Sequence, residues 1–205
     1  MQLDEVIPLI SPLIAVLDKQ GIKYAIGGSV AAILYGATLK PNGSDREPGD
    51  VDLLANIKLS QVPNLVYDLF NFYDLVLGPT INSAISSHSS FNIISPAFGS
   101  THIDIFCARP DNFEISCFND ARSLRIDTSN PREFLVMRPE DVVTYKLQHV
   151  GNNPTDRDRY DIRQILRTQS AKNGGPGIEK LRIGVGARHF NIVQLGMDAI
   201  RDAGI

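Results

Sequence analysis

The sequence predicts an α+β fold, with a β-sheet in the N-terminal part of the chain and helices in the C-terminal part. Two observations indicate it. Short apolar runs bounded by Gly, Pro and Asn, which are typical of strands, are concentrated before residue 118. From residue 139 onward, apolar residues recur every three or four positions, which is typical of helices. We therefore expect an α+β core over residues 1–120 and a helical region over residues 121–205 that packs on it.

The first expected element is an amphipathic helix over residues 4–20, with one apolar side. Pro8 and Pro12 interrupt it, so a second interpretation starts a shorter helix at Pro12, with Ser11 as its N-cap. Gly21 ends the helix in either case. The apolar side consists of Val6, Leu9, Ile10, Leu13, Ile14 and Leu17.

A strand over residues 23–26 is followed by a Gly-Gly-Ser turn, which starts a second helix that Gly36 ends. Residues 37–49 contain many turn-forming residues and few apolar ones, so we expect a mobile loop there. The remaining expected elements are strands over 50–56, 91–94, 101–107 and 113–117, and helices over 60–71, 139–150, 155–167 and 187–203.

The composition is that of an ordinary globular protein and excludes few classes of function. Of the 205 residues, 43% are hydrophobic and 21% are charged, and the net charge of -3 gives no overall basic surface for nucleic acid. Cys107 and Cys117 lie between apolar neighbours without metal-ligand spacing, so we expect reduced cysteines and a cytoplasmic protein. The acidic N-terminus does not resemble a signal peptide, and no apolar run has the length of a membrane span.

Three aspartates are the strongest candidates for a functional site. Asp50 and Asp52 begin a predicted strand, in which residues two apart point to the same face, so their carboxylates would lie side by side and repel each other. Asp104 lies within an apolar strand, where an unpaired acid is costly. A divalent cation would relieve both conflicts. Carboxylate oxygens favour magnesium, with manganese as the alternative.

A turn, Gly27-Gly28-Ser29, precedes these aspartates and lies between a strand and a helix, where backbone amides form a site for an anion. Such turns are common, and this one is not a Walker sequence, because no Gly-Lys-Ser/Thr follows. His102 shares a strand face with Asp104 and either borders the site or is a bystander. The structural alternative for Asp104 is a salt bridge with Arg46 or Lys146.

The order of these motifs resembles the nucleotidyltransferase superfamily that shares the DNA polymerase β-like palm. The pattern of its small AbiEii toxin-like members is Gly-Gly-Ser/Thr, a short helix, Arg-x-Thr-x-Asp-Ile/Leu-Asp-Leu and a later strand with a third Asp. Here Pro48 stands at the Thr position, and the loop before Arg46 is longer. The likeness continues over residues 138–147 and 158–162, whereas residues 168–205 match no known pattern.

The resemblance implies a nucleotidyltransferase-type mixed sheet flanked by helices. It also implies a magnesium-dependent enzyme that transfers nucleoside monophosphate from an NTP such as ATP to a hydroxyl acceptor, by a two-metal mechanism. Asp50, Asp52 and Asp104 would be catalytic and bind the metal ions. The residues implied to contact the nucleotide are Gly27, Gly28, Ser29, Arg46 and Lys146.

Two further aspartates, Asp158 and Asp161, lie three residues apart on one helix face. They either hold Lys146 or a substrate group, or pair with the neighbouring arginines. The acceptor cannot be read from the sequence: tRNA, a small molecule and a protein all fit, and the AbiEii likeness adds a toxin role with a cognate antitoxin. The alternative to an enzyme is a binding protein, a catalytically silent member of the same fold that binds a nucleotide or a protein. A nuclease would require a His-Asp cluster, which the scattered histidines do not predict.

Overall fold

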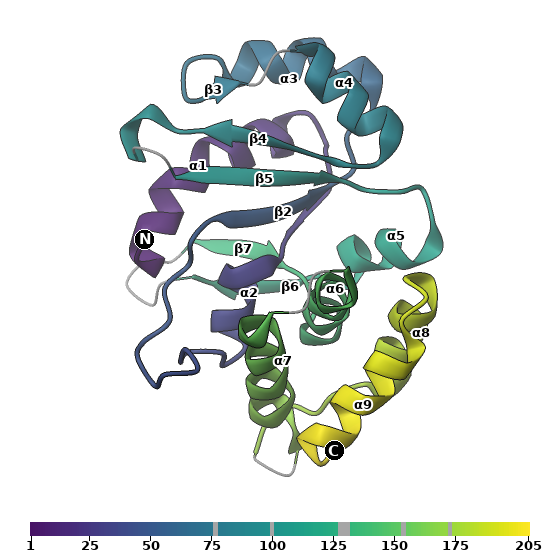
Figure 1. The fold of residues 1–205 in the computed structure, drawn as a ribbon. Coiled ribbons are helices and arrows are strands. Elements are labelled where there is room, and N and C mark those ends of the chain that lie inside the picture. The colour runs from purple at the N-terminus through teal and green to yellow at the C-terminus, as the bar shows by residue number, and fades with distance from the viewer. Residues whose placement is uncertain (76–77, 99–100, 127–131, 153–154, 172–173) are drawn as a thin grey trace. The chain divides into compact units, whose positions relative to one another are not determined.

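The computed structural model describes the whole chain except residues 76–77, 99–100, 127–131, 153–154 and 172–173 (Figure 1). The chain divides into two compact units. The units are Met1–Val30 with Pro48–Val136, and Ala31–Glu47 with Met137–Ile205.

The first unit is built around a mixed β-sheet, which confirms the predicted fold class. Among the described residues the sheet has seven strands, in the order β3-β4-β5-β2-β1-β7-β6. The β2/β5 and β1/β7 pairs are parallel, and the other neighbours are antiparallel. The strands are β1 (Tyr24–Ile26), β2 (Val51–Ala55), β3 (Asp74–Leu75), β4 (Ser90–Ile94), β5 (His102–Cys107), β6 (Arg122–Arg125) and β7 (Glu133–Val136). The helical elements are α1 (Leu3–Lys19), η1 (Leu59–Gln61), α3 (Val62–Leu69), α4 (Gly78–Ser87), η2 (Pro96–Phe98) and α5 (Asn112–Asn119).

Helix α1 runs through both Pro8 and Pro12, so the longer of the two predicted helices is the correct one. Each internal proline removes a hydrogen bond and costs about 3 kcal/mol. The six predicted apolar residues are at most 2% exposed. Burial of each such side chain contributes about 1.5–3 kcal/mol. Burial of this face therefore outweighs the cost of the two prolines.

The strand predicted over residues 113–117 is wrong, because α5 occupies this stretch. The side chain of Asp111 caps the helix by accepting a hydrogen bond from the amide of Glu114 at 2.9 Å. Phe113 and Cys117 are buried while Ile115 between them is exposed, whereas a strand would place all three on one face. The local cap therefore decides the conformation of an apolar run that is short enough to fit either element.

The sheet extends to Val136, beyond the boundary predicted at residue 120, because β6 and β7 form an antiparallel pair at its end. Val136 of β7 pairs in parallel with Ile26 of β1, which joins this pair to the rest of the sheet. Both strands are four residues long and carry charged side chains. Strand β6 (Arg-Ser-Leu-Arg) lacks the apolar composition by which strands are recognised in a sequence, and the apolar run of β7 (Glu-Phe-Leu-Val) is only three residues long.

The second unit is largely helical. It contains α6 (Pro139–Asn152), α7 (Asp156–Gln169), α8 (Lys180–His189), α9 (Val193–Ala203) and most of α2 (Gly28–Leu34). The predicted starts of α6 at Pro139 and of α7 after Thr155 are confirmed. The helix predicted over 187–203 is instead the end of α8 followed by α9, because Asn191 between them has a φ of 58°. Among the described helices, none combines the length and apolarity that crossing a membrane requires.

Residues 38–46 of the second unit form a hairpin. Leu39 and Asp45 form a β-bridge, and the amide of Arg46 donates to the carbonyl of Thr38 at 2.8 Å. The side chain of Gln164 on α7 exchanges hydrogen bonds with the backbone of Leu39. The sequence predicted a mobile loop over residues 37–49. The contacts with Gln164 have no signal in the local sequence, because Leu39 and Gln164 are 125 positions apart.

Candidate active site

Strands β2 and β5 place the predicted aspartates on one face of the sheet. The two strands are parallel, and their register pairs Asp52 with Asp104. Paired residues of adjacent strands project from the same face, as do residues two apart within a strand. Asp50 directly precedes β2, so the register continued by one residue sets it opposite His102, the first residue of β5. Three carboxylates and one imidazole thus occupy two rows on one face.

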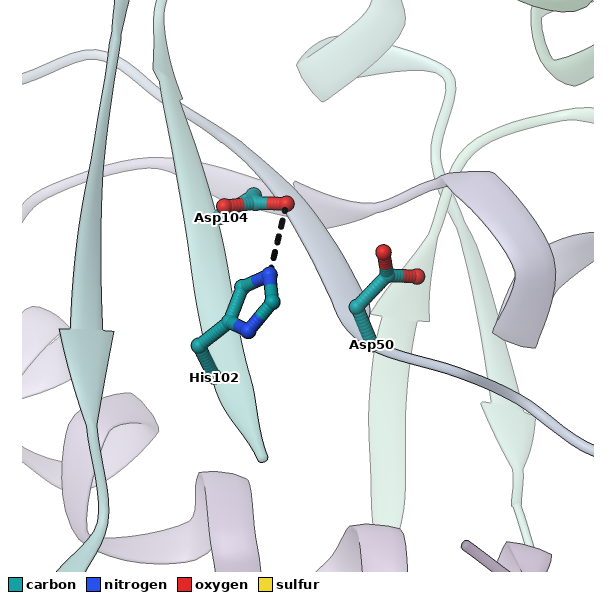
Figure 2. A group of neighbouring side chains, drawn as sticks. All are labelled: Asp50, His102 and Asp104. Atoms are coloured by element: carbon teal, nitrogen blue, oxygen red, sulfur yellow. Dashed lines mark ion pairs between the residues drawn. The ribbon is translucent and has the colours of Figure 1, made fainter. Parts of the chain in front are cut away.

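Figure 2 shows Asp50, His102 and Asp104 as neighbouring side chains. Each offers a ligand atom that lies within 4.8 Å of those of the other two. Nε2 of His102 is 3.6 Å from Oδ2 of Asp104, and the two side chains are 37% and 20% exposed. The intervening Ile103 points to the other face and is fully buried. The polar group therefore lies on the solvated face of a strand whose opposite face is core.

The surroundings of Asp104 disfavour its charged form. Burial is the largest cause of its raised pKa; the nearby His102 lowers this pKa, and the negative charge of Asp50 raises it. The net rise shows that the protein alone does not compensate the charge of this carboxylate. A bound cation would do so.

The Gly27-Gly28-Ser29 turn contacts both Asp50 and Asp52. The amide of Gly27 donates to the carbonyl of Asp52 at 2.9 Å, and the hydroxyl of Ser29 donates to the carbonyl of Asp50 at 3.2 Å. Gly28 has a φ of +54°, and a Cβ added to it would lie 1.6 Å from Oδ2 of Asp52. The carboxylate of Asp52 therefore occupies the space that any other residue at position 28 would need for its side chain.

The donor set at this face fits a divalent cation. Asp50 and Asp104 offer carboxylate oxygens, the ligands that Mg²⁺ prefers, and His102 offers an imidazole nitrogen. This group of three does not include Asp52, whose carboxylate is directed at Gly28. A cation held by Asp50 and Asp104 would also remove the repulsion between them.

The other predicted site residues form an ion-pair network within the second unit. Nζ of Lys146 is 2.8 Å from Oδ2 of Asp161 and 3.1 Å from Oδ1 of Asp158. Nη2 of Arg46 is 2.8 Å from Oδ2 of Asp161, and these two side chains are 2% and 0% exposed. Buried charges are stable only when they are paired, and here two cations face two carboxylates.

Asp158 is held by three side chains at once. In addition to Lys146, the hydroxyl of Thr155 lies 2.6 Å and Nδ1 of His149 lies 2.7 Å from its Oδ2. Burial by itself would raise the pKa of Asp158, but these hydrogen bonds and the charge of Lys146 outweigh it and lower the pKa to about 2. Of the alternatives left open by the sequence, the structure shows both aspartates holding Lys146.

Two histidines join these groups beyond the predicted site residues. His102 had a signal in the sequence, because it lies two residues before Asp104 in a strand, but the same signal fits a bystander. His149 lies three residues after Lys146 on α6, which sets both on one helix face. Its contact with Asp158 on α7 depends on the packing of two helices and had no local signal.

Comparison with solved structures supports this fold. The antibiotic-resistance factor ANT(2'')-Ia superposes with a TM-score of 0.56 at 12% identity, covering 97% of this chain and 98% of its own. The chain has a nucleotidyltransferase fold. At this identity the likeness concerns the fold and not the activity.

Other comparisons add little to this likeness. A nucleotidyltransferase-like antigenic protein from Paracoccidioides brasiliensis reaches a TM-score of only 0.48 at 16% identity, over 96% of this chain and 93% of its own. No protein-family model and no curated protein matches the sequence.

Proposed function

We propose that this chain is a magnesium-dependent nucleotidyltransferase that transfers nucleoside monophosphate from an NTP to a hydroxyl group. The observation that carries the proposal is the convergence of Asp50, His102 and Asp104 beside Asp52, on a sheet with a nucleotidyltransferase fold. Carboxylates grouped on one solvated face are costly without a cation, and phosphoryl transfer is a chemistry that requires one.

The carboxylates would have different roles. Asp50 and Asp104 would hold the divalent ion, and Asp52 is the further carboxylate on the same face. When bound, divalent ions stabilise the charge that develops on the transferred phosphoryl group and on the leaving pyrophosphate. Asp104 would also accept the proton of the attacking hydroxyl, because its carboxylate lies at the proposed cation site. The use of two ions stays a prediction.

The start of α2 would bind the triphosphate. The first amides of a helix have no partner within it and attract anions, so Gly28 and Ser29 are the proposed donors. The amide of Gly27 already donates to the carbonyl of Asp52. Gly27 would therefore shape the turn that presents the other two residues.

Arg46 and Lys146 stay candidate phosphate contacts. Both cations now share Asp161 as a partner, and both side chains are at most 9% exposed. A phosphate contact would thus require each cation to exchange a carboxylate for a phosphate oxygen. This exchange is favoured only if the triphosphate supplies the hydrogen bonds that Asp161 and Asp158 lose.

The acceptor and the NTP are open parts of the proposal. An AbiEii-like toxin that modifies tRNA and is inhibited by a cognate antitoxin is one form of it, and transfer to an antibiotic or to a protein hydroxyl is another. Incubation of the pure protein with each labelled NTP, Mg²⁺ and, separately, tRNA, antibiotics and a cell extract would identify the labelled product.

The same assay tests the site. Asp104→Asn and Asp50→Asn should each lower transfer at least about 100-fold, because each removes a cation ligand and the first also removes the base. Asp18→Asn, the same change at an exposed position of α1, is the matched control and should retain transfer. Undiminished transfer by Asp104→Asn would refute the assigned role. Nucleotide binding without any labelled product would instead support the catalytically silent alternative.

A further inference from the structure

We propose that His102 is a direct ligand of the divalent cation and that its nitrogen makes the site favour Mn²⁺ over Mg²⁺. The inference rests on the proposed function, since it concerns the cation of that same site. It adds a specificity-determining residue that the three aspartates do not predict.

The register of the sheet supports this role. On the shared face of β2 and β5, Asp52 is opposite Asp104, and the preceding pair is Asp50 opposite His102. His102 is thus the fourth member of a group of side chains whose other three members are carboxylates. A cation that contacts Asp50 and Asp104, which are diagonal to each other, has His102 within the same group of ligand atoms, all within 4.8 Å.

The distances also suit a shared ion. With metal–ligand bonds of about 2.1 Å, two ligands of an octahedral ion lie about 3.0 Å apart when adjacent and about 4.2 Å apart when opposite. Nε2 of His102 and Oδ2 of Asp104 are 3.6 Å apart, between these values. This separation is longer than a hydrogen bond, so Nε2 of His102 is not hydrogen-bonded to Asp104.

The chemistry of the donor set indicates which ion is favoured. Mg²⁺ is a hard cation that takes oxygen ligands and keeps several waters, and it gains little from an imidazole. Transition metals bind imidazole as well as carboxylate, and among them Mn²⁺ suits a site that is rich in carboxylates. The imidazole should therefore add affinity for Mn²⁺ and little for Mg²⁺.

The test is electron paramagnetic resonance of the full chain titrated with Mn²⁺ alone, with Mg²⁺ as competitor. Directly bound imidazole gives Mn²⁺ a hyperfine coupling to ¹⁴N. We expect this coupling in the unaltered protein, its loss in both His102→Phe and His102→Asn, and at least about a tenfold loss of Mn²⁺ affinity in His102→Phe. His102→Asn replaces the imidazole with an amide whose oxygen can still bind a cation. The ratio of Mn²⁺ affinity to Mg²⁺ affinity should therefore fall in this variant.

Two controls separate the outcomes. His88→Asn changes an exposed histidine of the same unit and should leave the coupling unchanged, whereas Asp50→Asn should abolish Mn²⁺ binding. Mn²⁺ binding that depends on Asp50 but shows no ¹⁴N coupling, or a coupling that persists in His102→Phe, would overturn the role of His102 and leave the proposed function intact. Absence of any Mn²⁺ or Mg²⁺ binding to the unaltered protein would overturn both.

Discussion

Gly28→Ala should damage the site by displacing Asp52. Gly28 lies at the start of α2 with a φ of +54°, and its Cα faces the Asp52 side chain. An added Cβ would lie 1.6 Å from Oδ2, 2.3 Å from Cγ and 2.6 Å from Cβ of Asp52. None of these contacts is physically tolerable, so either the turn or the carboxylate must move.

The expected cost has two parts. A residue with a Cβ in the left-handed region costs about 1–2 kcal/mol. Forcing Asp52 away from its present rotamer adds about 0.5–1.5 kcal/mol. The sum is about 1.5–3.5 kcal/mol, which for a chain of this size lowers Tm by about 3–14 °C at about 2–4 °C per kcal/mol. Because the carboxylate of Asp52 leaves its place beside the proposed cation site, nucleotidyl transfer should fall as well.

Scanning calorimetry of Gly28→Ala beside Gly21→Ala measures this cost. Gly21 has a φ of +62° and nothing within 4 Å of an added Cβ, so Gly21→Ala should show the backbone cost alone. The excess at Gly28 should disappear when Asp52→Gly is combined with Gly28→Ala, because that change removes the atoms in conflict. Equal losses of Tm for the two single alanine variants would show that Asp52 does not pack against Gly28.

Three further results are expected. Lys146→Met should cost about 3–5 kcal/mol in urea denaturation, because it leaves the carboxylates of Asp158 and Asp161 without their shared cation, whereas the exposed Lys40→Met should change little. Folding lowers the pKa of Asp158 from 3.8 to about 2, so the ionised side chain contributes on the order of 2 kcal/mol to the free energy of unfolding. This contribution is present above about pH 4 and is lost as the pH falls toward 2. Asp158→Asn should therefore make the free energy of unfolding less dependent on pH in this range. Because the pKa of Asp104 is raised, its ionised form destabilises the metal-free protein at neutral pH. Asp104→Asn should therefore raise Tm in EDTA, and a lowered Tm would contradict this reasoning.

Local sequence patterns predicted the elements that carry the site. Strands β2 and β5 were recognisable because their Val, Ile and Leu residues are contiguous or alternate, and the period of two then set Asp50, Asp52 and Asp104 on defined faces. The pairing of Asp52 with Asp104 is a property of the sheet, and no pattern within either strand contains its register.

Local patterns were insufficient where two structures have similar local free energies. The apolar residues around Phe113 fit a short strand or a helix, and the cap from Asp111 decides for the helix. Strand β6 has little strand propensity of its own and is stabilised by its antiparallel pairing with β7, which in turn pairs with β1. At Phe113 a local cap thus decides the conformation, whereas at β6 the pairing within the sheet outweighs propensity.

The sequence by itself determined which residues can do chemistry at this site, since residue type and spacing place three carboxylates on two strands beside a glycine turn. Only the tertiary structure decided which charges meet. Arg46 and Lys146 are equally suited in sequence to a phosphate or to a carboxylate, because a cation is attracted to either anion. Packing of α6, α7 and the hairpin over residues 38–46 buries both cations against Asp161, and a buried charge must take the partner that lies within its reach.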